Sequence, residues 1–262
     1  MNHENFRSFA LELAAAAREQ TLGRFAGGCE AQDKGGGADF DPVTDADREA
    51  ERAMRALIEA AFPDHGIAGE EFPDRPAEGR YVWSLDPVDG TRSFTCALPN
   101  WTTLIALLED GLPVVGVIDA PCLDELCIGS ARGASLISKG AEIPLRVSSR
   151  TALAEARFST TDPYLFSGAE QEAFERLRVA VRTARYGHDG YGYARLAAGG
   201  LDLIVENSLK PHDYNALIPV VRGAGGVIGD WAGGSDFSPG KIIAAATPEL
   251  FEQAVAIMQS AA

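Results

Sequence analysis

Apolar side chains near the start of the chain recur at the spacing of a helix. An alanine-rich segment at 5–25 carries them at Phe6, Phe9, Leu13 and Leu22, and a glycine pair follows at 27–28. This pattern predicts an amphipathic helix from Asn5 to about Phe25. A second helical pattern runs from Ala46 to Ala61 and stops before Pro63, because a residue that precedes proline disfavours helical geometry.

Short apolar runs replace the helical pattern between residues 66 and 147, which predicts strands. The runs lie at 67–68, 81–85, 102–108, 113–118, 126–128, 135–137 and 145–147. Glu109-Asp110-Gly111 and Lys139-Gly140 separate neighbouring runs and are typical of hairpin turns. We therefore expect a largely antiparallel sheet in this part of the chain.

Helical and strand-like patterns alternate after Arg150. The helical patterns lie at 171–181, 191–198, 213–224 and 248–258, and the strand-like ones at 156–159, 203–205, 227–228 and 241–245. This alternation predicts a mixed α/β half. We expect two halves, residues 1–150 and 151–262, packed as one compact unit.

Composition limits the classes of protein to consider. The chain has 262 residues, 46% of them hydrophobic, which is enough for a large core, and its formal net charge is -15. Nucleic-acid binding would need clustered Lys and Arg, so we expect no nucleic-acid partner. No apolar run is long enough for a bilayer, and no signal-like segment opens the chain.

The cysteines carry no metal or redox motif. They are scattered without a C-x-x-C pair, at Cys29, Cys96, Cys122 and Cys127. We therefore expect a cytoplasmic protein with free thiols and no membrane partner. A disulfide between Cys122 and Cys127 is the less favoured alternative.

The segment D-P-V-D-G-T at 86–91 places two carboxylates three positions apart, followed by a glycine and a hydroxyl. Pro87 cannot donate a ladder hydrogen bond, so we expect the preceding strand to end at Asp86 and both acids to lie in a loop. A helix that starts near Thr91 would direct free N–H groups toward an anion. Divalent cations bound by the acids would reverse the local charge and admit a phosphate ester.

Two more acidic segments follow predicted strands, Gly69-Glu70-Glu71 and His212-Asp213. Oxygen ligands of this kind suit magnesium. Each segment also has an ordinary interpretation, because paired glutamates are often solvated and an aspartate often caps a helix. Thr44-Asp45-Ala46-Asp47 has the form of a capping box, and we favour capping for that motif.

Together these segments resemble the inositol monophosphatase family of metal-dependent phosphatases. The family pattern is G-E-E, then D-P-[IV]-D-G-T-x-x-F, then an aspartate that opens a late helix leading into A-G-G. This chain has G-E-E at 69–71, the second motif from Asp86 to Phe94, and Asp213 followed by A-G-G at 224–226. The resemblance implies a mixed α and β fold, the layered αβαβα sandwich of the inositol monophosphatase and fructose-1,6-bisphosphatase type.

The resemblance also implies a set of metal ligands. Glu70, Asp86 and the backbone carbonyl of Val88 would bind one metal. Asp86 would bridge to a second metal, held also by Asp89 and Asp213. The implied cofactor is Mg²⁺, with two or three ions per active site and Mn²⁺ as the alternative.

Catalytic and phosphate-binding roles follow from the same resemblance. Backbone donors of Gly90 and Thr91, beside Asp89, would bind the substrate phosphate. Thr91, hydrogen-bonded to Asp47, would act with Glu70 to orient and deprotonate the water that attacks phosphorus in line. Asp47 would then both cap its helix and act in catalysis. Relatives of this kind imply a homodimer; a non-catalytic phosphate-binding regulator is the alternative class.

The later half of the chain is similar to the histidinol-phosphatase branch of this family. Branch members read L-K-P-[YH]-D, A-L-[IV]-P and G-G-V-I-x-D-W, and this chain has L-K-P-H-D at 209–213, A-L-I-P at 216–219 and G-G-V-I-G-D-W at 225–231. The resemblance implies a phosphomonoesterase acting on L-histidinol phosphate in histidine biosynthesis. Inositol-1-phosphate, or a broad range of sugar and nucleotide phosphates, is the alternative.

Histidinol carries an ammonium and an imidazole, so its pocket needs acids or other acceptors. Asp189 falls where inositol phosphatases carry a small apolar residue, and Glu206 matches the position that receives substrate hydroxyls. Asn207 is a further candidate for an imidazole contact. The alternatives are that Asp189 caps the following helix and that Glu206 faces solvent.

Several other polar residues have no assigned role. We favour a structural role for His188 and His212 over that of a base or metal ligand. Arg182 and Arg185 could reach a phosphate in a neighbouring subunit or only a surface acid. Lys34 could approach the metal site from its glycine-rich loop.

Overall fold

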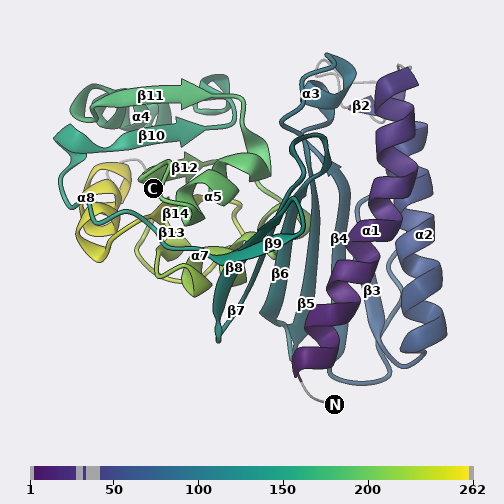
Figure 1. Cartoon of the computed structure of the whole chain (residues 1–262). Coiled ribbons are helices and arrows are strands. Elements are labelled where there is room, and N and C mark those ends of the chain that lie inside the picture. The colour runs from purple at the N-terminus through teal and green to yellow at the C-terminus, as the bar shows by residue number, and fades with distance from the viewer. Residues whose placement is uncertain (1–2, 28–31, 34–41, 260–262) are drawn as a thin grey trace.

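The computed structural model describes residues 3–27, 32–33 and 42–259, and it has five layers (Figure 1). A helix pair covers one face of a seven-stranded sheet, and central helices separate that sheet from a five-stranded one. A second helix pair covers the outer face of the smaller sheet. The expected αβαβα sandwich is therefore confirmed. Lys34 and Cys29 lie outside the described residues.

The first layer is formed by α1 (His3–Gly27) and α2 (Asp45–Ala61). Their apolar faces pack on each other and on the large sheet, with Phe6, Leu13 and Met54 fully buried. Thr44 caps α2 in the predicted capping box, because its side chain and that of Asp47 bond reciprocally to the backbone. Between the helices, β1 (Gln32–Asp33) pairs with β2 (Pro42–Val43).

The large sheet has the strand order β3-β4-β5-β6-β7-β8-β9. Its strands are β3 (Gly66–Gly69), β4 (Tyr81–Asp89), β5 (Thr102–Glu109), β6 (Leu112–Ala120), β7 (Glu125–Ser130), β8 (Gly133–Ser138) and β9 (Ala141–Pro144). β3 is parallel to β4 and the other pairs are antiparallel, as predicted. Both predicted hairpin turns are present, with positive φ at Asp110 and Gly111 and at Lys139 and Gly140.

The predicted strand at 145–147 is wrong. The last strand, β9, ends at Pro144 instead. The N–H of Leu145 still donates to the carbonyl of Ala134 in β8, but that of Val147 donates to the carbonyl of Ala224, so the chain turns from the large sheet to the end of a central helix. A short 3₁₀ turn, η1 (Pro121–Leu123), connects β6 to β7.

β4 continues through the acidic motif, so the prediction that it ends at Asp86 is wrong. Asp86 pairs with Leu104 and Asp89 with Thr102, and the register shifts between them. The shift leaves Pro87 outside the ladder, where its missing N–H removes no hydrogen bond. The helix α3 (Thr91–Thr95) does begin at Thr91, after Gly90 turns the chain with φ of 82°.

The central layer contains α5 (Asp189–Ala197), α6 (Pro211–Tyr214) and α7 (Leu217–Gly223). The pattern at 213–224 predicts one helix, whereas the structure has two. Pro219 lies in the first turn of α7, where a proline sacrifices no helical hydrogen bond, so a new helix begins there.

The five-stranded sheet is mixed, as predicted, with the order β11-β10-β12-β14-β13. Its strands are β10 (Arg157–Thr160), β11 (Thr183–Tyr186), β12 (Leu203–Glu206), β13 (Val227–Asp230) and β14 (Ile242–Ala245). β10 runs parallel to β11 and β12, while β14 is antiparallel to β12 and β13. The short polar strand β11 has no apolar run and escapes prediction.

The outer layer consists of α4 (Ala169–Ala180) and α8 (Pro248–Met258), which pack on each other. Short 3₁₀ turns, η2 (Leu153–Glu155) and η3 (Pro163–Leu165), flank β10. The two sheets occupy residues 66–144 and 157–245, and the division into halves at 1–150 and 151–262 stays a prediction.

Two features bear on the predicted setting of the protein. No helix in the described ranges is long and apolar enough to cross a membrane. Cys96, Cys122 and Cys127 are all free, so the alternative disulfide is absent among them.

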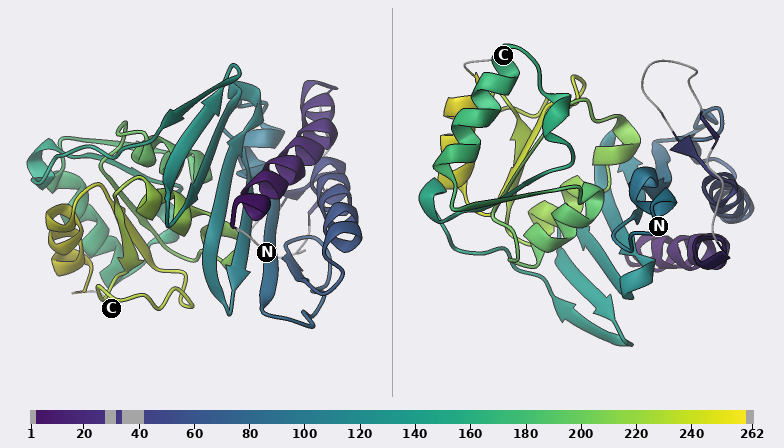
Figure 2. Two further views of the ribbon diagram at one scale, coloured as in Figure 1. Left: turned by 60° about the horizontal axis from the view of Figure 1, so that its bottom comes forward. Right: turned by 90° about the horizontal axis from the view of Figure 1, so that it is seen from above.

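Two glycines let the large sheet approach the central layer closely, and Figure 2 shows the two layers from other directions. A Cβ on Gly116 in β6 would lie 2.1 Å from the carbonyl oxygen of Ala216, and one on Gly129 in β7 would lie 2.4 Å from that of Pro219. Both obstacles are backbone atoms, which side-chain rotation cannot relieve. A side chain at either position would push α7 away from the sheet.

We expect Gly129→Ala to lower the free energy of unfolding by about 1–3 kcal/mol, because overpacking displaces α7. Gly23→Ala is the matched control, since a Cβ on Gly23 in α1 meets nothing within 4 Å. It should raise stability by about 0.5–1 kcal/mol. Urea unfolding followed by circular dichroism measures both changes, and a loss in Gly23→Ala equal to that in Gly129→Ala would contradict the packing argument.

Candidate active site

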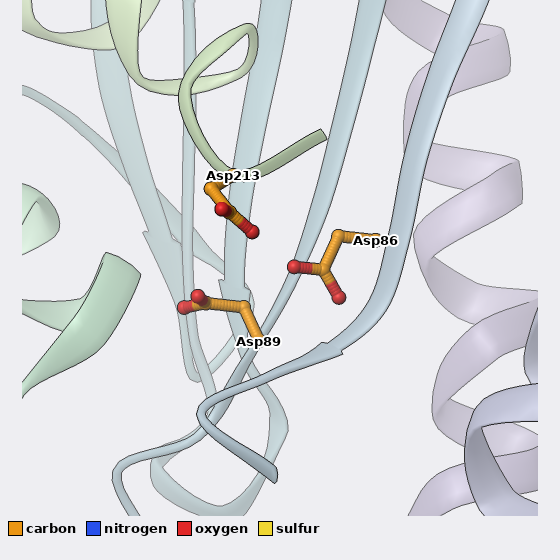
Figure 3. Close-up of side chains that lie close together, drawn as sticks. All are labelled: Asp86, Asp89 and Asp213. Carbon is orange, nitrogen blue, oxygen red and sulfur yellow. The ribbon is translucent and has the colours of Figure 1, made fainter. Parts of the chain in front are cut away.

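Three aspartates lie close together, two from one strand and one from a distant helix (Figure 3). Asp86 and Asp89 come from β4, and Asp213 from α6. One carboxylate oxygen of each lies within 4.8 Å of the others. The three predicted metal ligands are thus brought together, as a group able to hold a cation.

Hydrogen bonds from the backbone and from one hydroxyl fix two of these carboxylates. Asp89 Oδ2 accepts from Thr102 Oγ1 and from the Gly190 N–H, both at 2.6 Å. Asp213 Oδ2 accepts from the Lys210 N–H at 2.7 Å. Thr102 is a contact that sequence reasoning missed, since only the register of β5 against β4 reveals it.

Asp86 differs, because its Oδ1 is buried and accepts no hydrogen bond in the described structure. A buried acceptor without a donor is unfavourable unless another positive group supplies the missing interaction. An oxygen-only donor set of this kind is what hard divalent cations bind. The residues present therefore fit a metal ion.

Burial and mutual repulsion raise the pKa values of the cluster. Burial raises the pKa of Asp86 well above its usual range, and the charges of Glu70 and Asp89 add to the effect. Burial also raises the pKa of Asp89 well above normal, with Asp189 as the main nearby charge. The pKa of Asp213 rises by burial too, although His212 opposes the shift. A bound cation would favour the ionised forms of all three.

Glu70 lies beside the cluster without joining the closest group. β3 ends at Gly69, which pairs with Leu85, and the Glu70 N–H donates to the Leu85 carbonyl at 3.2 Å. This register sets Glu70 next to Asp86 on the neighbouring strand. Both residues line the same cavity.

Glu51 supports the Glu70 segment, and sequence reasoning missed it. It is fully buried, accepts the Glu71 N–H at 2.8 Å and pairs with Arg55 at 2.7 Å. A Cβ on Gly69 would lie 2.0 Å from its carboxylate, so a side chain there would displace Glu51. The available signal was the four-residue spacing from Asp47 on one face of α2.

The expected hydrogen bond between Thr91 and Asp47 is not formed. The Thr91 hydroxyl donates to the Val88 carbonyl at 3.0 Å. Asp47 Oδ2 accepts both the N–H and the hydroxyl of Thr44, because the capping box brings that residue closer, and Oδ1 has no partner. Burial raises the pKa of Asp47 to about 6.

The aspartate cluster opens onto a cavity of about 530 Å³, whose wall includes both Asp189 and Glu206. The alternative roles of these residues are wrong. Asp189 makes no capping hydrogen bond to α5, and Glu206 is only 2% exposed. Glu206 accepts from the Thr161 N–H at 2.8 Å and from the hydroxyls of Thr160 and Thr161 at 3.1 Å.

Burial raises the pKa values of both cavity carboxyls, Asp189 and Glu206. It raises the pKa of Asp189 to about 6, although Arg92 opposes the shift. It raises the pKa of Glu206 to about 8 despite the hydrogen bonds from Thr161. A cation in this part of the cavity would offset both shifts.

Asn207 does not line the cavity, in contrast to its predicted role. Its amide donates to Glu170 Oε2 at 2.8 Å and to the Leu165 carbonyl at 3.3 Å. Successive residues of an extended chain point to opposite sides, so Glu206 and Asn207 cannot both face the cavity. The carbonyl of Glu206 accepts the indole N–H of Trp231 at 3.1 Å, which fixes the end of β12 from behind.

The remaining polar candidates are divided between the cavity and the surface. His212 lines the cavity with Nε2 3.5 Å from Asp213, whereas His188 contacts Ser159 at 3.1 Å. Arg182 and Arg185 are exposed. Sequence reasoning missed Arg92 and Asp162, which pair at 3.4 Å and both line the cavity.

The sequence profile of the inositol monophosphatase family matches residues 2–262. The chain belongs to this family. Members of this family are metal-dependent, and the chain is accordingly a phosphomonoesterase. A solved structure of an inositol monophosphatase from Zymomonas mobilis has a TM-score of 0.86 and 38% sequence identity, and the match covers 99% of both chains.

Two curated relatives are also similar to the chain. The bifunctional phosphatase IMPL2 of Arabidopsis thaliana is 47% identical over 197 residues, which are 74% of this chain and 56% of that protein. The chain thus spans little more than half of that relative. A histidinol-phosphatase of Chlorobaculum parvum is 37% identical over 228 residues, covering 86% of this chain and 85% of that protein.

We expect the metal-free protein to lose thermal stability as the pH rises from about 5 to 8. The pKa values of about 8 for Glu206 and about 6 for Asp47 mean that the folded state binds more protons than the unfolded chain in this range. Stability therefore falls as these protons dissociate. Calorimetry with a chelator present measures the midpoint, and Glu206→Gln should flatten its pH dependence. A wild-type midpoint independent of pH would contradict these shifts.

Proposed function

We propose that this phosphatase hydrolyses L-histidinol phosphate to L-histidinol and phosphate, with magnesium as its cofactor, in histidine biosynthesis in the cytoplasm. One observation carries the proposal: a single cavity joins the aspartate cluster to two further carboxyls, Asp189 and Glu206. A neutral polyol would offer these acids only hydroxyl hydrogen bonds, whereas an ammonium and an imidazole would also supply the positive charge that buried carboxylates need. The Chlorobaculum relative, named a histidinol-phosphatase, supports the same substrate.

At the phosphate end, Asp86, Asp89 and Asp213 would hold the cations, together with Glu70 and the carbonyl of Val88. We propose two or three Mg²⁺ ions, with Mn²⁺ as the alternative. When bound, such ions lower the pKa of a water molecule and neutralise charge on phosphoryl oxygens. The partnerless Oδ1 of Asp86 supports this assignment.

The chain's own groups would position the attacking water and hold its proton. Glu70 lines the cavity beside Asp86 and would accept that proton. Asp47, with a pKa of about 6, is the carboxyl behind it that can share the proton near neutral pH. Thr91 would not relay the proton between Asp47 and the site, because its hydroxyl donates to the Val88 carbonyl instead.

Gly90 and Thr91 would supply backbone N–H groups to the phosphate, beside Asp89. The positive φ of Gly90 makes the abrupt turn from β4 into α3 that this arrangement needs. An O–P bond then forms to the water oxygen while the ester P–O bond breaks in line. The leaving alkoxide takes up a proton and departs as the alcohol.

In the same cavity, Asp189 and Glu206 would pair with the cationic part of the substrate. Ion pairing would restore the ionised state that burial opposes, so the pairing depends on a cationic substrate. Asp189 lies close to the proposed phosphate-binding turn, since a Cβ on Gly90 would lie 2.8 Å from its Oδ2. We propose a homodimer as the assembled form.

Inositol-1-phosphate is the second candidate substrate, favoured by the likeness to the Zymomonas inositol monophosphatase. We expect kcat/KM for L-histidinol phosphate to exceed that for inositol-1-phosphate by at least about 100-fold, because only the former brings a positive charge to the two acids. Phosphate-release assays with Mg²⁺ measure the ratio. Excess chelator should abolish both activities, and a preference for the inositol ester would disprove the proposed substrate.

Asp189→Asn should raise KM for L-histidinol phosphate by about 10-fold or more, because a charge-assisted pairing is lost. The KM for p-nitrophenyl phosphate, an ester without a cation, should change little. Asp110→Asn in the exposed β5–β6 turn is the matched control and should leave both values unchanged. Steady-state kinetics decides the matter, and equal effects of Asp189→Asn on the two esters would rule out cation binding.

A further inference from the structure

The hydroxyl of Tyr193 is a buried donor without a partner. Among the residues that the structure describes, four buried side-chain atoms lack any hydrogen-bond partner, namely Asp47 Oδ1, Asp86 Oδ1, Trp101 Nε1 and Tyr193 Oη. The first two are carboxylate acceptors, which a cation can satisfy. Trp101 does not line the active-site cavity, whereas Tyr193 does. Tyr193 therefore stands apart as a partnerless donor in the cavity wall.

Helix geometry directs Tyr193 toward the proposed substrate end of the cavity. It lies one turn after Asp189 on α5, so the two side chains share a face of the helix. Tyr191 belongs to a different face, where its hydroxyl donates to Glu125 at 3.2 Å and its ring lies 5.8 Å from the Arg195 guanidinium. Of Tyr191 and Tyr193, only Tyr191 therefore has a hydrogen-bond partner for its hydroxyl among the described residues.

The surroundings keep the Tyr193 hydroxyl protonated. Burial raises its pKa well above the usual range, and the nearby charges of Glu206, Asp89 and Asp213 raise it further. It is therefore a neutral O–H donor at any physiological pH. Those carboxylates already accept from other groups of the protein: Glu206 from Thr160 and Thr161, Asp89 from Thr102 and Gly190, and Asp213 from Lys210.

A buried donor left unpaired is unfavourable, and nearly all such groups in proteins find an acceptor. Among the described residues no protein atom accepts from the Tyr193 hydroxyl, and Tyr193 is one of the residues that line the active-site cavity. Asp189 and Glu206, when ionised, can only accept hydrogen bonds. The two carboxylates can therefore bind hydrogen-bond donors of a substrate, but they cannot bind its hydrogen-bond acceptors.

We propose that Tyr193 determines specificity by donating a hydrogen bond to an acceptor atom in the alcohol part of the substrate, which in an imidazole is the unprotonated ring nitrogen. This inference rests on the proposed function and deepens it. The carboxylates recognise the ammonium and the ring N–H, and Tyr193 recognises the remaining nitrogen. The three groups together select a ring that carries one donor and one acceptor.

The test compares L-histidinol phosphate with L-phenylalaninol phosphate, which has the same amino-alcohol chain and a ring without nitrogen. Tyr193→Phe removes only the hydroxyl. It should lower kcat/KM for the histidinol ester about 10- to 100-fold, chiefly through KM, and leave kcat/KM for the phenylalaninol ester unchanged. Its melting temperature should equal or exceed that of the wild type, because no protein hydrogen bond is lost.

Tyr191→Phe is the matched control, two residues away on the same helix. It should lower the melting temperature by removing the bond to Glu125, without altering the ratio between the two esters. An equal loss on both esters in Tyr193→Phe, or a lowered melting temperature with an unchanged ratio, would overturn the specificity role alone. A wild-type enzyme that prefers inositol-1-phosphate would overturn the proposed substrate, and this inference with it.

Discussion

The structure depends on holding like charges together out of water. Asp86, Asp89 and Asp213 would repel one another and resist burial, yet one oxygen from each lies within 4.8 Å of the rest. The fold meets this requirement with rigid supports: β4 carries two of the acids, and donors from Thr102, Gly190 and Lys210 fix their orientation. The Asp86 oxygen that has no hydrogen-bond donor then favours the binding of a cation. The rest of the protein must be stable enough to hold the three acids in place.

Packing between the layers serves the same requirement. Asp213 lies on α6, whose neighbour α7 packs against β6 and β7 at the two glycines that allow close approach. On the opposite face of the sheet, α2 supplies Glu51 to hold the segment that carries Glu70. The acids from both halves of the chain thus keep their positions because each is attached to an element that cannot move independently of the large sheet. The backbone contacts of the core therefore fix the positions of the side chains at the site.

Local patterns in the sequence predicted most elements, because periodicity and turn chemistry act over a few residues. The grouping of Asp86, Asp89 and Asp213 was predicted from the resemblance to the inositol monophosphatase family. The failures have nonlocal causes. The register shift in β4 depends on its pairing with β5, and the partner of Thr91 depends on which carbonyl the turn brings near. Asn207 was assigned to the cavity, although strand alternation turns it away. Helical spacing places Glu51 one turn after Asp47, but its contact with the Glu71 N–H depends on how α2 packs against the end of β3.

Trp231 gives the late G-G-V-I-G-D-W motif a physical meaning. The indole does not line the cavity, but it donates to the backbone of Glu206 and lies under the ammonium of Lys241. Through Trp231 the motif therefore holds the end of the strand that carries Glu206, the carboxyl for which we propose a substrate contact. When related phosphatases diverge toward a new alcohol, we expect the motif and the carboxyl to change together. Positions remote from any ligand would then be as informative about substrate preference as the pocket itself.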